Sequence, residues 1–167
     1  MNTVKLSSKM SVNQRQRKQA KIYIAAPLFS PAERQFNEEV CSAIESSCAV
    51  YLPQRDGMLV ESVTREEFKV AEKVCRCVYT QDIEAIRRSD VVVAVLDGRA
   101  LDEGVCIEMG YAKALGKVII GYKSDVRVTL PWGHNPIVSG CVDVWIKCLD
   151  DLSNWFEHFS KRTPRKV

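Results

Sequence analysis

The sequence predicts an α/β fold: a flavodoxin- or Rossmann-like parallel sheet of about five strands flanked by helices. The first observation behind this prediction is the segment 91–96, VVVAVL, in which six apolar residues follow one another without a polar residue. Such a run is typical of a strand that is covered on both faces, as in parallel sheets. The second observation is that strand-like and helix-like segments alternate along the chain, which predicts right-handed crossovers and a parallel sheet.

The first strand is expected at residues 21–26, with a helix soon after it. Ser30 is a suitable N-cap, Pro31 suits the first helical position, and Glu33 completes a capping box. The helix is expected to extend to about Ser47, with apolar residues four positions apart facing the core.

The second strand is expected at residues 49–52, followed by a turn-rich loop at 53–57. Residues 63–90 are expected to be mostly helical, because acidic residues follow Thr64 in a first turn. Within this segment, residues 79–88 are expected to form a second helical piece.

The segment 91–96 is expected to be the third strand. After it we expect, in order, a helix at 105–116 that ends at a glycine, a strand at 117–122, an ordered irregular segment at 123–140, a strand at 142–146 and a helix at 151–159.

The basic residues gather at the two ends of the chain. Residues 1–21 contain six Lys or Arg and no acid, and residues 161–167 contain four and no acid, whereas the part between them has 14 basic and 21 acidic residues. We therefore expect one domain at 21–160, a disordered basic extension at 1–20 and a basic tail at 161–167. A basic tail can contact nucleic acid or a membrane, but a solvated extension is the simpler interpretation, and neither partner is expected.

The composition argues against several classes of protein. No apolar run approaches the roughly 18 residues of a membrane span, and no apolar segment follows the N-terminal charges as in a secretory signal. Seven cysteines whose spacing fits no disulfide framework indicate a reducing compartment. We expect a cytoplasmic protein in which most cysteines are small core residues. Because the two histidines lie far along the chain, no metal site is expected.

Glu108 is the candidate catalytic residue, one turn into the helix that follows the buried strand. The loop before this helix contains Asp102 and Glu103, and the carboxyl ends of parallel strands are where α/β sheets place their ligands. A helical Glu is usually a solvated surface charge, but the neighbours of Glu108 are apolar, and Gly110 permits close approach of a ligand. A carboxylate at the mouth of a sheet can act as a nucleophile toward C1 of a sugar.

Three motifs resemble those of the nucleoside 2-deoxyribosyltransferase family, over roughly residues 21–135. The pattern D-x-G-x-x-x-E-x-G-x-A at 102–112 looks like the catalytic signature of that family. The segments KIYIAAPLF at 21–29 and YTQD at 79–82 resemble its other two motifs, in the same order. Deoxynucleoside monophosphate N-glycosidases share the same scaffold.

The resemblance implies roles for five residues. Glu108 is the nucleophile, Asp82 protonates the leaving base, and Tyr23 orients the nucleophilic carboxylate. Asp102 holds the sugar 3′-hydroxyl. Asn135 reaches into the active site of a neighbouring subunit and binds the sugar 5′-hydroxyl, so a homo-oligomer is expected. The implied ligands are a 2′-deoxyribonucleoside and a free nucleobase, with no metal or organic cofactor.

Three further residues are candidate contacts to the substrate. Gln54 and Asp56 lie in the loop after the second strand, on the side of the expected crevice, and Phe29 lies in the first loop. The pattern alone also allows plain structural interpretations: Gln54 and Asp56 as ordinary loop residues, Asp82 as an acid at a helix start, Asn135 as a turn residue and Tyr23 as a packed strand residue.

Two alternatives to base exchange in nucleotide salvage stay open. The first is a 2′-deoxynucleoside 5′-monophosphate N-glycosidase, in which water replaces the acceptor base. The bulky apolar loop 26–29 and the carboxylate of Asp102 favour a neutral nucleoside over a phosphorylated one. The second is a non-catalytic nucleotide-binding module, which has no need for two acids on either side of a glycosidic bond.

Overall fold

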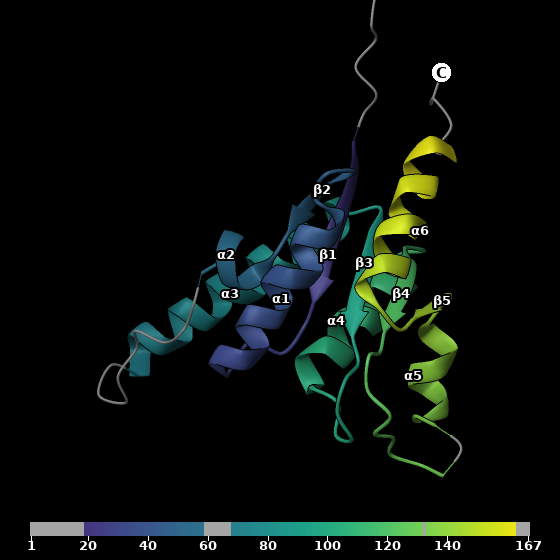
Figure 1. Cartoon of the computed structure of the whole chain (residues 1–167). Helices are drawn as coiled ribbons and strands as arrows, with labels where there is room; N and C mark the ends of the chain where they lie inside the picture. Colours follow the sequence, from purple (N-terminus) through teal and green to yellow (C-terminus); the bar gives the residue numbers. More distant parts are fainter. Residues whose placement is uncertain (1–18, 59–67, 132, 163–167) are drawn as a thin grey trace, which may run out of the picture.

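Five parallel strands form a single sheet in the computed structural model, which describes residues 19–58, 68–131 and 133–162 (Figure 1). The strands lie in the order β2-β1-β3-β4-β5. Their bounds are β1 (Ala20–Ala25), β2 (Cys48–Tyr51), β3 (Val91–Val95), β4 (Val118–Tyr122) and β5 (Val144–Ile146). The predicted fold class is confirmed, and residues 1–18 and 163–167 of the two expected tails lie outside the described residues.

Helices cover both faces of the sheet. They are α1 (Pro31–Ile44), α2 (Pro53–Asp56), α3 (Phe68–Arg88), α4 (Glu103–Ala114), α5 (Pro136–Cys141) and α6 (Leu149–Arg162). Helices α1 and α6 pack against each other on one face, and α4 packs with α3 and α5 on the other. The result is a three-layer α/β/α arrangement in which all strands point the same way (Figure 1).

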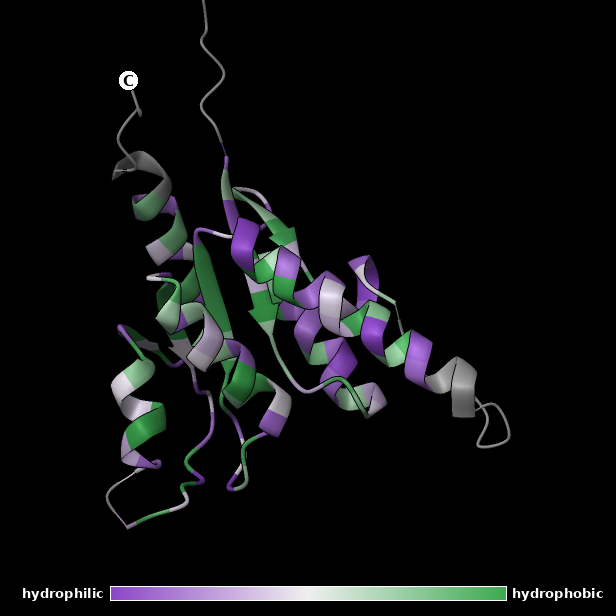
Figure 2. Ribbon diagram, turned by 180° about the vertical axis from the view of Figure 1, so that it is seen from behind, coloured by the Kyte–Doolittle hydropathy of each residue, from purple (hydrophilic) through white to green (hydrophobic). Residues whose placement is uncertain are grey.

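Two separate apolar clusters hold the layers together. Because successive side chains of a strand point to opposite faces of the sheet, Ile22 and Ile24 of β1 pack on the side of α1 and α6. Tyr23 and Ala25 pack on the side of α3 and α4. Strand β3 is buried along its whole length, as its apolar sequence predicts. The strands are accordingly largely green, for hydrophobic, whereas the helices alternate between green and purple along their length (Figure 2).

The expected capping box at the start of α1 is confirmed. The Glu33 amide donates to the Ser30 hydroxyl, and the Ser30 amide donates to the Glu33 carboxylate. The box fixes the chain direction directly after β1, where the first motif ends.

Several element boundaries differ from those expected. Residues 53–56 form the short helix α2 rather than a loop, because Pro53 suits a first helical position. The same holds for Pro136, which starts α5 inside the segment expected to be irregular. Helix α3 is continuous where two pieces were expected, because no Gly or Pro interrupts it; the expected helix start at 63–67 lies outside the described residues.

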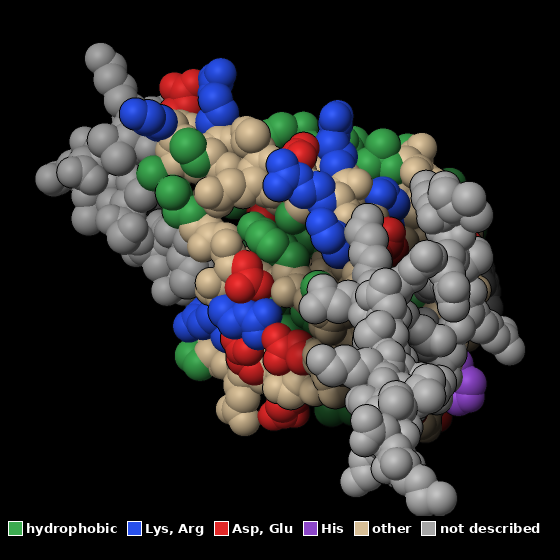
Figure 3. All heavy atoms as spheres, turned by 90° about the horizontal axis from the view of Figure 1, so that it is seen from above, with side chains coloured by type: hydrophobic (Ala, Val, Ile, Leu, Met, Phe, Trp, Pro, Cys, Tyr) green, Lys and Arg blue, Asp and Glu red, His purple; other side chains and the backbone are tan. Residues whose placement is uncertain are grey.

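The expectation that most cysteines are core residues is wrong. Cys41 and Cys48 are buried, whereas Cys75 and Cys148 are exposed and the other three are partly exposed. In the part of the chain that the structure describes, no helix combines the length and the apolar character needed to cross a membrane. On the face at which β1 begins, positively and negatively charged side chains are interspersed around apolar ones (Figure 3).

Candidate active site

Tyr23 occupies the middle of β1 and is fully buried on the side of α3 and α4. Its direction follows from the strand, because the adjacent residues Ile22 and Ile24 face the opposite side. A hydroxyl on a fully buried ring needs a hydrogen-bond partner. The partner is a carboxylate from the third motif.

Glu108 of α4 is this partner. The helix buries Val105, Met109 and Ala112, and Glu108 lies three residues after the first and four before the last, on the same side of the helix. The Tyr23 hydroxyl donates a hydrogen bond to Glu108 Oε1 over 2.5 Å. The structure therefore joins the first and third sequence motifs in one contact.

The Glu108 carboxyl group is difficult to ionise. Burial is the largest cause and raises its pKa, the hydrogen bond from Tyr23 lowers the pKa, and the charges of Asp82 and Asp102 raise it further, to about 8. The pKa of Tyr23 is also raised, first by burial and then by the charges of Glu108 and Asp82. The tyrosine therefore remains a hydrogen-bond donor.

Asp82 belongs to the same cluster. It precedes the buried Ile86 by one turn of α3 and thus lies on the side of the helix that faces the sheet. Burial raises its pKa to about 6, and its charge acts on both Tyr23 and Glu108. A carboxyl group with this pKa can both release and accept a proton near neutral pH.

Tyr51 is a member of the cluster that the sequence did not single out. Its ring lies parallel to that of Tyr23, with an angle of 12° between the planes and 5.7 Å between the ring centres. Burial raises the Tyr51 pKa, and the charges of Asp82 and Asp56 add to the shift. The available signal was an aromatic residue at the carboxyl end of the strand next to β1.

Asp102 is the N-cap of α4, and its Oδ1 accepts a hydrogen bond from the Val105 amide over 2.9 Å. A Cβ atom on Gly104 would lie 3.0 Å from that same oxygen, which explains the glycine two positions after the aspartate in the motif. The cap ties the position of Asp102 to the helix that carries Glu108.

Two acidic residues fasten the loop that leads to Asp102. Asp97 accepts hydrogen bonds from the amide and the hydroxyl of Ser124. Asp125 accepts one from the Gly98 amide at 2.9 Å and pairs with Lys123 at 2.6 Å. The ends of β3 and β4 are thereby fixed to each other, and the loop between β3 and α4 has a defined path.

Gln54 is placed in a supporting role by its contacts. Both of its amide hydrogens are used, one on the Arg34 carbonyl and one on Glu38, and its oxygen accepts from the buried Asn37. Asn37 also donates to the Pro27 carbonyl. This network connects the loop after β1 to α1 and α2, and the described hydrogen bonds of Gln54 do not include Tyr23, Asp82 or Glu108.

Asp56 and Phe29 do not join the cluster. Asp56 accepts from the Leu52 amide over 2.8 Å and pairs with Arg55, so its carboxylate closes the α2 turn. Phe29 lies in the loop between β1 and α1 and is 77% exposed. An exposed aromatic residue at this position is available to cover a ligand.

Asn135 lies apart from the cluster. It is the exposed N-cap of α5, and its Oδ1 accepts from the Ile137 amide over 2.9 Å. It borders a hollow of about 460 Å³ together with Leu101 and Cys106, and Glu108 is not among the residues that line this hollow. An exposed position is compatible with the predicted contact to a neighbouring subunit, which stays a prediction.

Comparison with known proteins places this geometry in a family. A sequence model of the family described as nucleoside 2-deoxyribosyltransferase matches residues 22–155. A nucleoside deoxyribosyltransferase of Limosilactobacillus fermentum is 31% identical over 133 residues, which cover 76% of this chain and 79% of the relative. The region matched by the family model contains the second and third motifs and the first motif from Ile22 onward.

Two solved structures share the fold. A conserved protein from Enterococcus faecalis superposes with a TM-score of 0.68 at 24% identity, covering 84% of this chain and 99% of that one. A 2-deoxyribosyltransferase from Bacillus psychrosaccharolyticus gives a TM-score of 0.67 at 19% identity, covering 81% of this chain and 91% of that one. The chain belongs to the nucleoside 2-deoxyribosyltransferase family.

Proposed function

We propose that this protein transfers 2-deoxyribose from a deoxyribonucleoside to a free nucleobase through a covalent intermediate on Glu108. The observation that carries the proposal is the hydrogen bond from the buried Tyr23 hydroxyl to Glu108 Oε1, inside a cluster that also contains Asp82. Two neighbouring carboxyl groups with raised pKa values, beside one tyrosine donor, suit nucleophilic catalysis with a separate general acid, in the form of the pair in which Glu108 is ionised and Asp82 carries the proton.

In the proposed first step, the ionised Glu108 attacks C1′ from the face opposite the base. The glycosidic bond breaks as Asp82 gives its proton to the departing base, and a deoxyribosyl ester forms on Glu108. In the second step Asp82, now ionised, takes a proton from the incoming base, which displaces the ester. Two inversions give net retention at C1′.

Tyr23 and Asp102 position the reacting groups. The Tyr23 hydrogen bond leaves the second Glu108 oxygen to face the sugar. The carboxylate of Asp102 is proposed to hold the 3′-hydroxyl, which orients the ring relative to Glu108. Preference for the 2-deoxy sugar follows if the pocket beside Glu108 is apolar, because a buried 2′-hydroxyl without a partner costs about 1–3 kcal/mol.

Asn135 is proposed to act in the active site of a neighbouring subunit, at the sugar 5′-hydroxyl. Asn135 is exposed, which leaves its side chain accessible to a neighbouring subunit. The functional unit is then a homo-oligomer, and the substrates are a deoxyribonucleoside and a free base within nucleotide salvage.

An exchange assay tests the proposal. Deoxyinosine is incubated with the protein with and without adenine, and products are separated by chromatography. Deoxyadenosine that forms only in the presence of adenine supports transfer. Release of free deoxyribose without deoxyadenosine, even when adenine is present, indicates hydrolysis, and binding without any product indicates a non-catalytic module; either result contradicts the proposal.

Matched variants of α4 sharpen this assay. Glu108→Gln is expected to abolish exchange because an amide is not a nucleophile toward C1′. Glu103→Gln, on the exposed first turn of the same helix, is the control and is expected to retain exchange. Unchanged turnover in Glu108→Gln would rule out the proposed nucleophile.

A further inference from the structure

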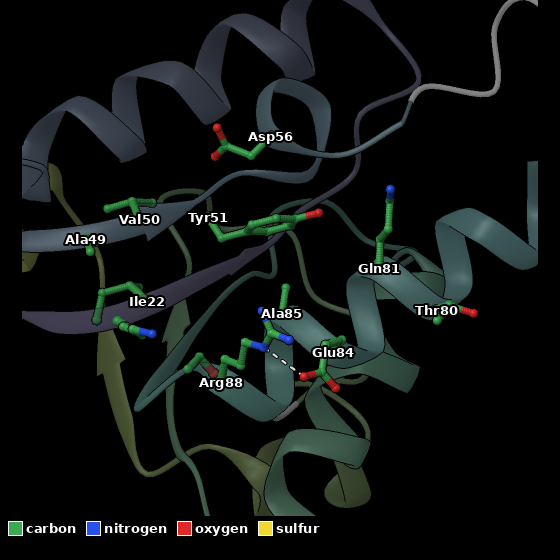
Figure 4. Close-up of a pocket in the computed structure, with 12 residues that line it drawn as sticks. Ile22, Ala49, Val50, Tyr51, Asp56, Thr80, Gln81, Glu84, Ala85 and Arg88 are labelled. Atoms are coloured by element: carbon green, nitrogen blue, oxygen red, sulfur yellow. Dashed lines mark hydrogen bonds and ion pairs between the residues drawn. The ribbon is translucent and has the colours of Figure 1, made fainter.

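A hollow of about 510 Å³ lies between β2 and α3, beside the cluster of Tyr23, Asp82 and Glu108. It is lined from the beginning of β1, from β2 and from the second half of α3 (Figure 4). Helix α3 packs chiefly against β1 and α4, which leaves this side of the edge strand β2 open. Hollows of about 300–1,000 Å³ are the size that binds small molecules.

One wall of the hollow is aromatic. Tyr51 extends from the end of β2 toward Ala85 and Gln81 on α3 (Figure 4). Ala85 and Ala49 have short side chains, so the space next to the tyrosine ring is not filled by the protein. An open aromatic ring beside small side chains suits a flat ring system, which stacks on the aromatic face.

The rim opposite Tyr51 offers paired hydrogen-bonding groups. Arg88 Nε donates to Glu84 Oε1 over 2.7 Å, and these side chains are 69% and 47% exposed. This pair uses one nitrogen and one oxygen, so further guanidinium hydrogens and the second carboxylate oxygen can face the hollow. A donor next to an acceptor complements the edge of a nucleobase, which carries a ring nitrogen or carbonyl beside an N–H group.

The geometry points to a second binding pocket, for a planar nitrogen heterocycle that stacks on Tyr51 and is held at its edge by the Glu84–Arg88 pair. The ligand class is a free nucleobase or a nucleoside. This pocket is not the proposed catalytic site, because Glu108, Asp82 and Asp102 do not line it. The choice of ligand rests on the proposed function, in which free bases and nucleosides are the substrates.

The pocket shares one residue with the catalytic cluster. Tyr51 stacks on Tyr23, and Tyr23 holds Glu108. A ligand stacked on Tyr51 therefore contacts a ring that packs against the residue that positions the nucleophile. Binding in the pocket is expected to change the rate of exchange without competing for the sugar site.

Calorimetric titration of the full-length Glu108→Gln chain with adenine and, separately, with adenosine tests the pocket without turnover. Ala85→Leu, added to that variant, fills the hollow and is expected to remove one binding event, with an affinity loss of tenfold or more there (about 1.4 kcal/mol or more). Ala114→Leu, an exposed alanine on α4, is the matched control and leaves the titration unchanged. Adenine and adenosine distinguish recognition of the base from recognition of the whole nucleoside.

If Ala85→Leu folds poorly, the same titration is carried out with Glu84→Gln and with Arg88→Met. Both side chains are exposed, so the fold tolerates their replacement, and each is expected to weaken binding about tenfold, as loss of a charge-assisted hydrogen bond does. If all variants bound adenine and adenosine with equal affinity, or showed a single binding event that no substitution changed, the proposed binding pocket would be disproved. Loss of binding in Ala85→Leu supports the pocket even if the unmodified protein shows no exchange, so the two proposals fail separately.

Discussion

At the level of single residues, burial and one hydrogen bond act on Glu108 in opposite directions. Burial raises the pKa of the carboxyl group, and the bond from Tyr23 lowers it because the bond stabilises the ionised form. The tyrosine thus makes a carboxylate available in a position where the surroundings favour the neutral acid. The proposed nucleophile depends on this balance.

Tyr23→Phe removes the donor and keeps the ring. We expect kcat for base exchange to fall about 10- to 100-fold, because a hydrogen bond to a charged group is worth about 1.5–3 kcal/mol. We also expect the pKa of Glu108 to rise further. Steady-state kinetics of the purified variant measure the first effect, and the pH dependence of kcat/KM measures the second.

Tyr51→Phe is the control for that variant. It retains the stacked ring of the pair and leaves the Tyr23 hydroxyl in place, so a much smaller loss of kcat is expected. If Tyr23→Phe had full activity, or if both variants lost activity equally, the hydrogen bond would not have the role described here.

The pH dependence of kcat/KM follows from the two raised carboxyl pKa values, about 6 for Asp82 and about 8 for Glu108. The reaction needs one ionised and one protonated carboxyl group. Below about pH 6 both groups are protonated, and above about pH 8 both are ionised. Between these values the pair holds one proton, mostly on Glu108, and the reactive form is the minor one in which Glu108 is ionised and Asp82 carries the proton. We expect a bell-shaped profile whose two limbs belong to the coupled pair. A flat profile from about pH 5 to 9 would contradict it.

At the level of elements, α4 combines a structural and a chemical task at its N-terminus. The Asp102 carboxylate caps the helix through the Val105 amide, and its charge raises the pKa of Glu108. The residue that starts the helix therefore also influences the residue one and a half turns later. These two effects can be separated by substitution.

Asp102→Asn keeps a good N-cap and removes the charge, whereas Asp102→Ala removes both. We expect Asp102→Ala to lower the free energy of unfolding by about 1 kcal/mol, and Asp102→Asn by much less. Both are expected to lower the pKa of Glu108, which moves the upper limb of the pH profile downward. Urea denaturation and the pH profile measure the two effects; equal stability of the two variants would disprove the capping role.

At the level of the whole molecule, the buried carboxyl groups of the proposed active site lower the free energy of unfolding at neutral pH. Glu108 has a folded-state pKa of about 8 against an ordinary value of 4.5, and Asp82 about 6 against 3.8. Between the ordinary pKa and the folded-state pKa of each group, the folded protein binds more protons than the unfolded chain. The free energy of unfolding therefore falls as the pH rises through this interval. The stability that the protonated Glu108 and Asp82 contribute is fully present below the pKa values of the unfolded chain, and it is lost above about pH 8.

Glu108→Gln removes most of this dependence. We expect the variant to match the unmodified protein near pH 4.5 and to have a higher Tm at pH 8 to 9, by about 2–4 °C for each kcal/mol of ionisation penalty removed. Thermal unfolding followed by circular dichroism across the pH range measures the difference. A Tm difference that does not change with pH would mean that Glu108 is not buried as described.

The sequence contained most of the fold, because the apolar run at 91–96 and the regular alternation of elements are physical signals of a buried parallel sheet. The short helices α2 and α5 were not predicted, since Pro at a first helical position is hard to distinguish from Pro in a loop. The contact between Tyr23 and Glu108 joins positions 85 residues apart, and only the motif resemblance anticipated it.

Neither Tyr51 nor the hydrogen bonds of Asp97 and Asp125 were predicted as parts of the site. Their roles arise from neighbouring strands and loops that meet only in the folded chain. Gln54 was expected to contact the base, which stays a prediction, and its amide also donates to the Arg34 carbonyl in α1. A polar residue in a loop carries no signal of its partner, so the sequence could not distinguish these cases.

The central claim is that Glu108 forms a covalent bond to the sugar. The most direct measurement is incubation with a 2′-fluorinated nucleoside, which slows breakdown of the glycosyl ester, followed by mass spectrometry of the intact chain and of its peptides. The account predicts one added fluorosugar on the peptide that contains Glu108, and none in Glu108→Gln. A fluorosugar on a different residue, or base exchange with the unmodified chain unlabelled, would contradict it.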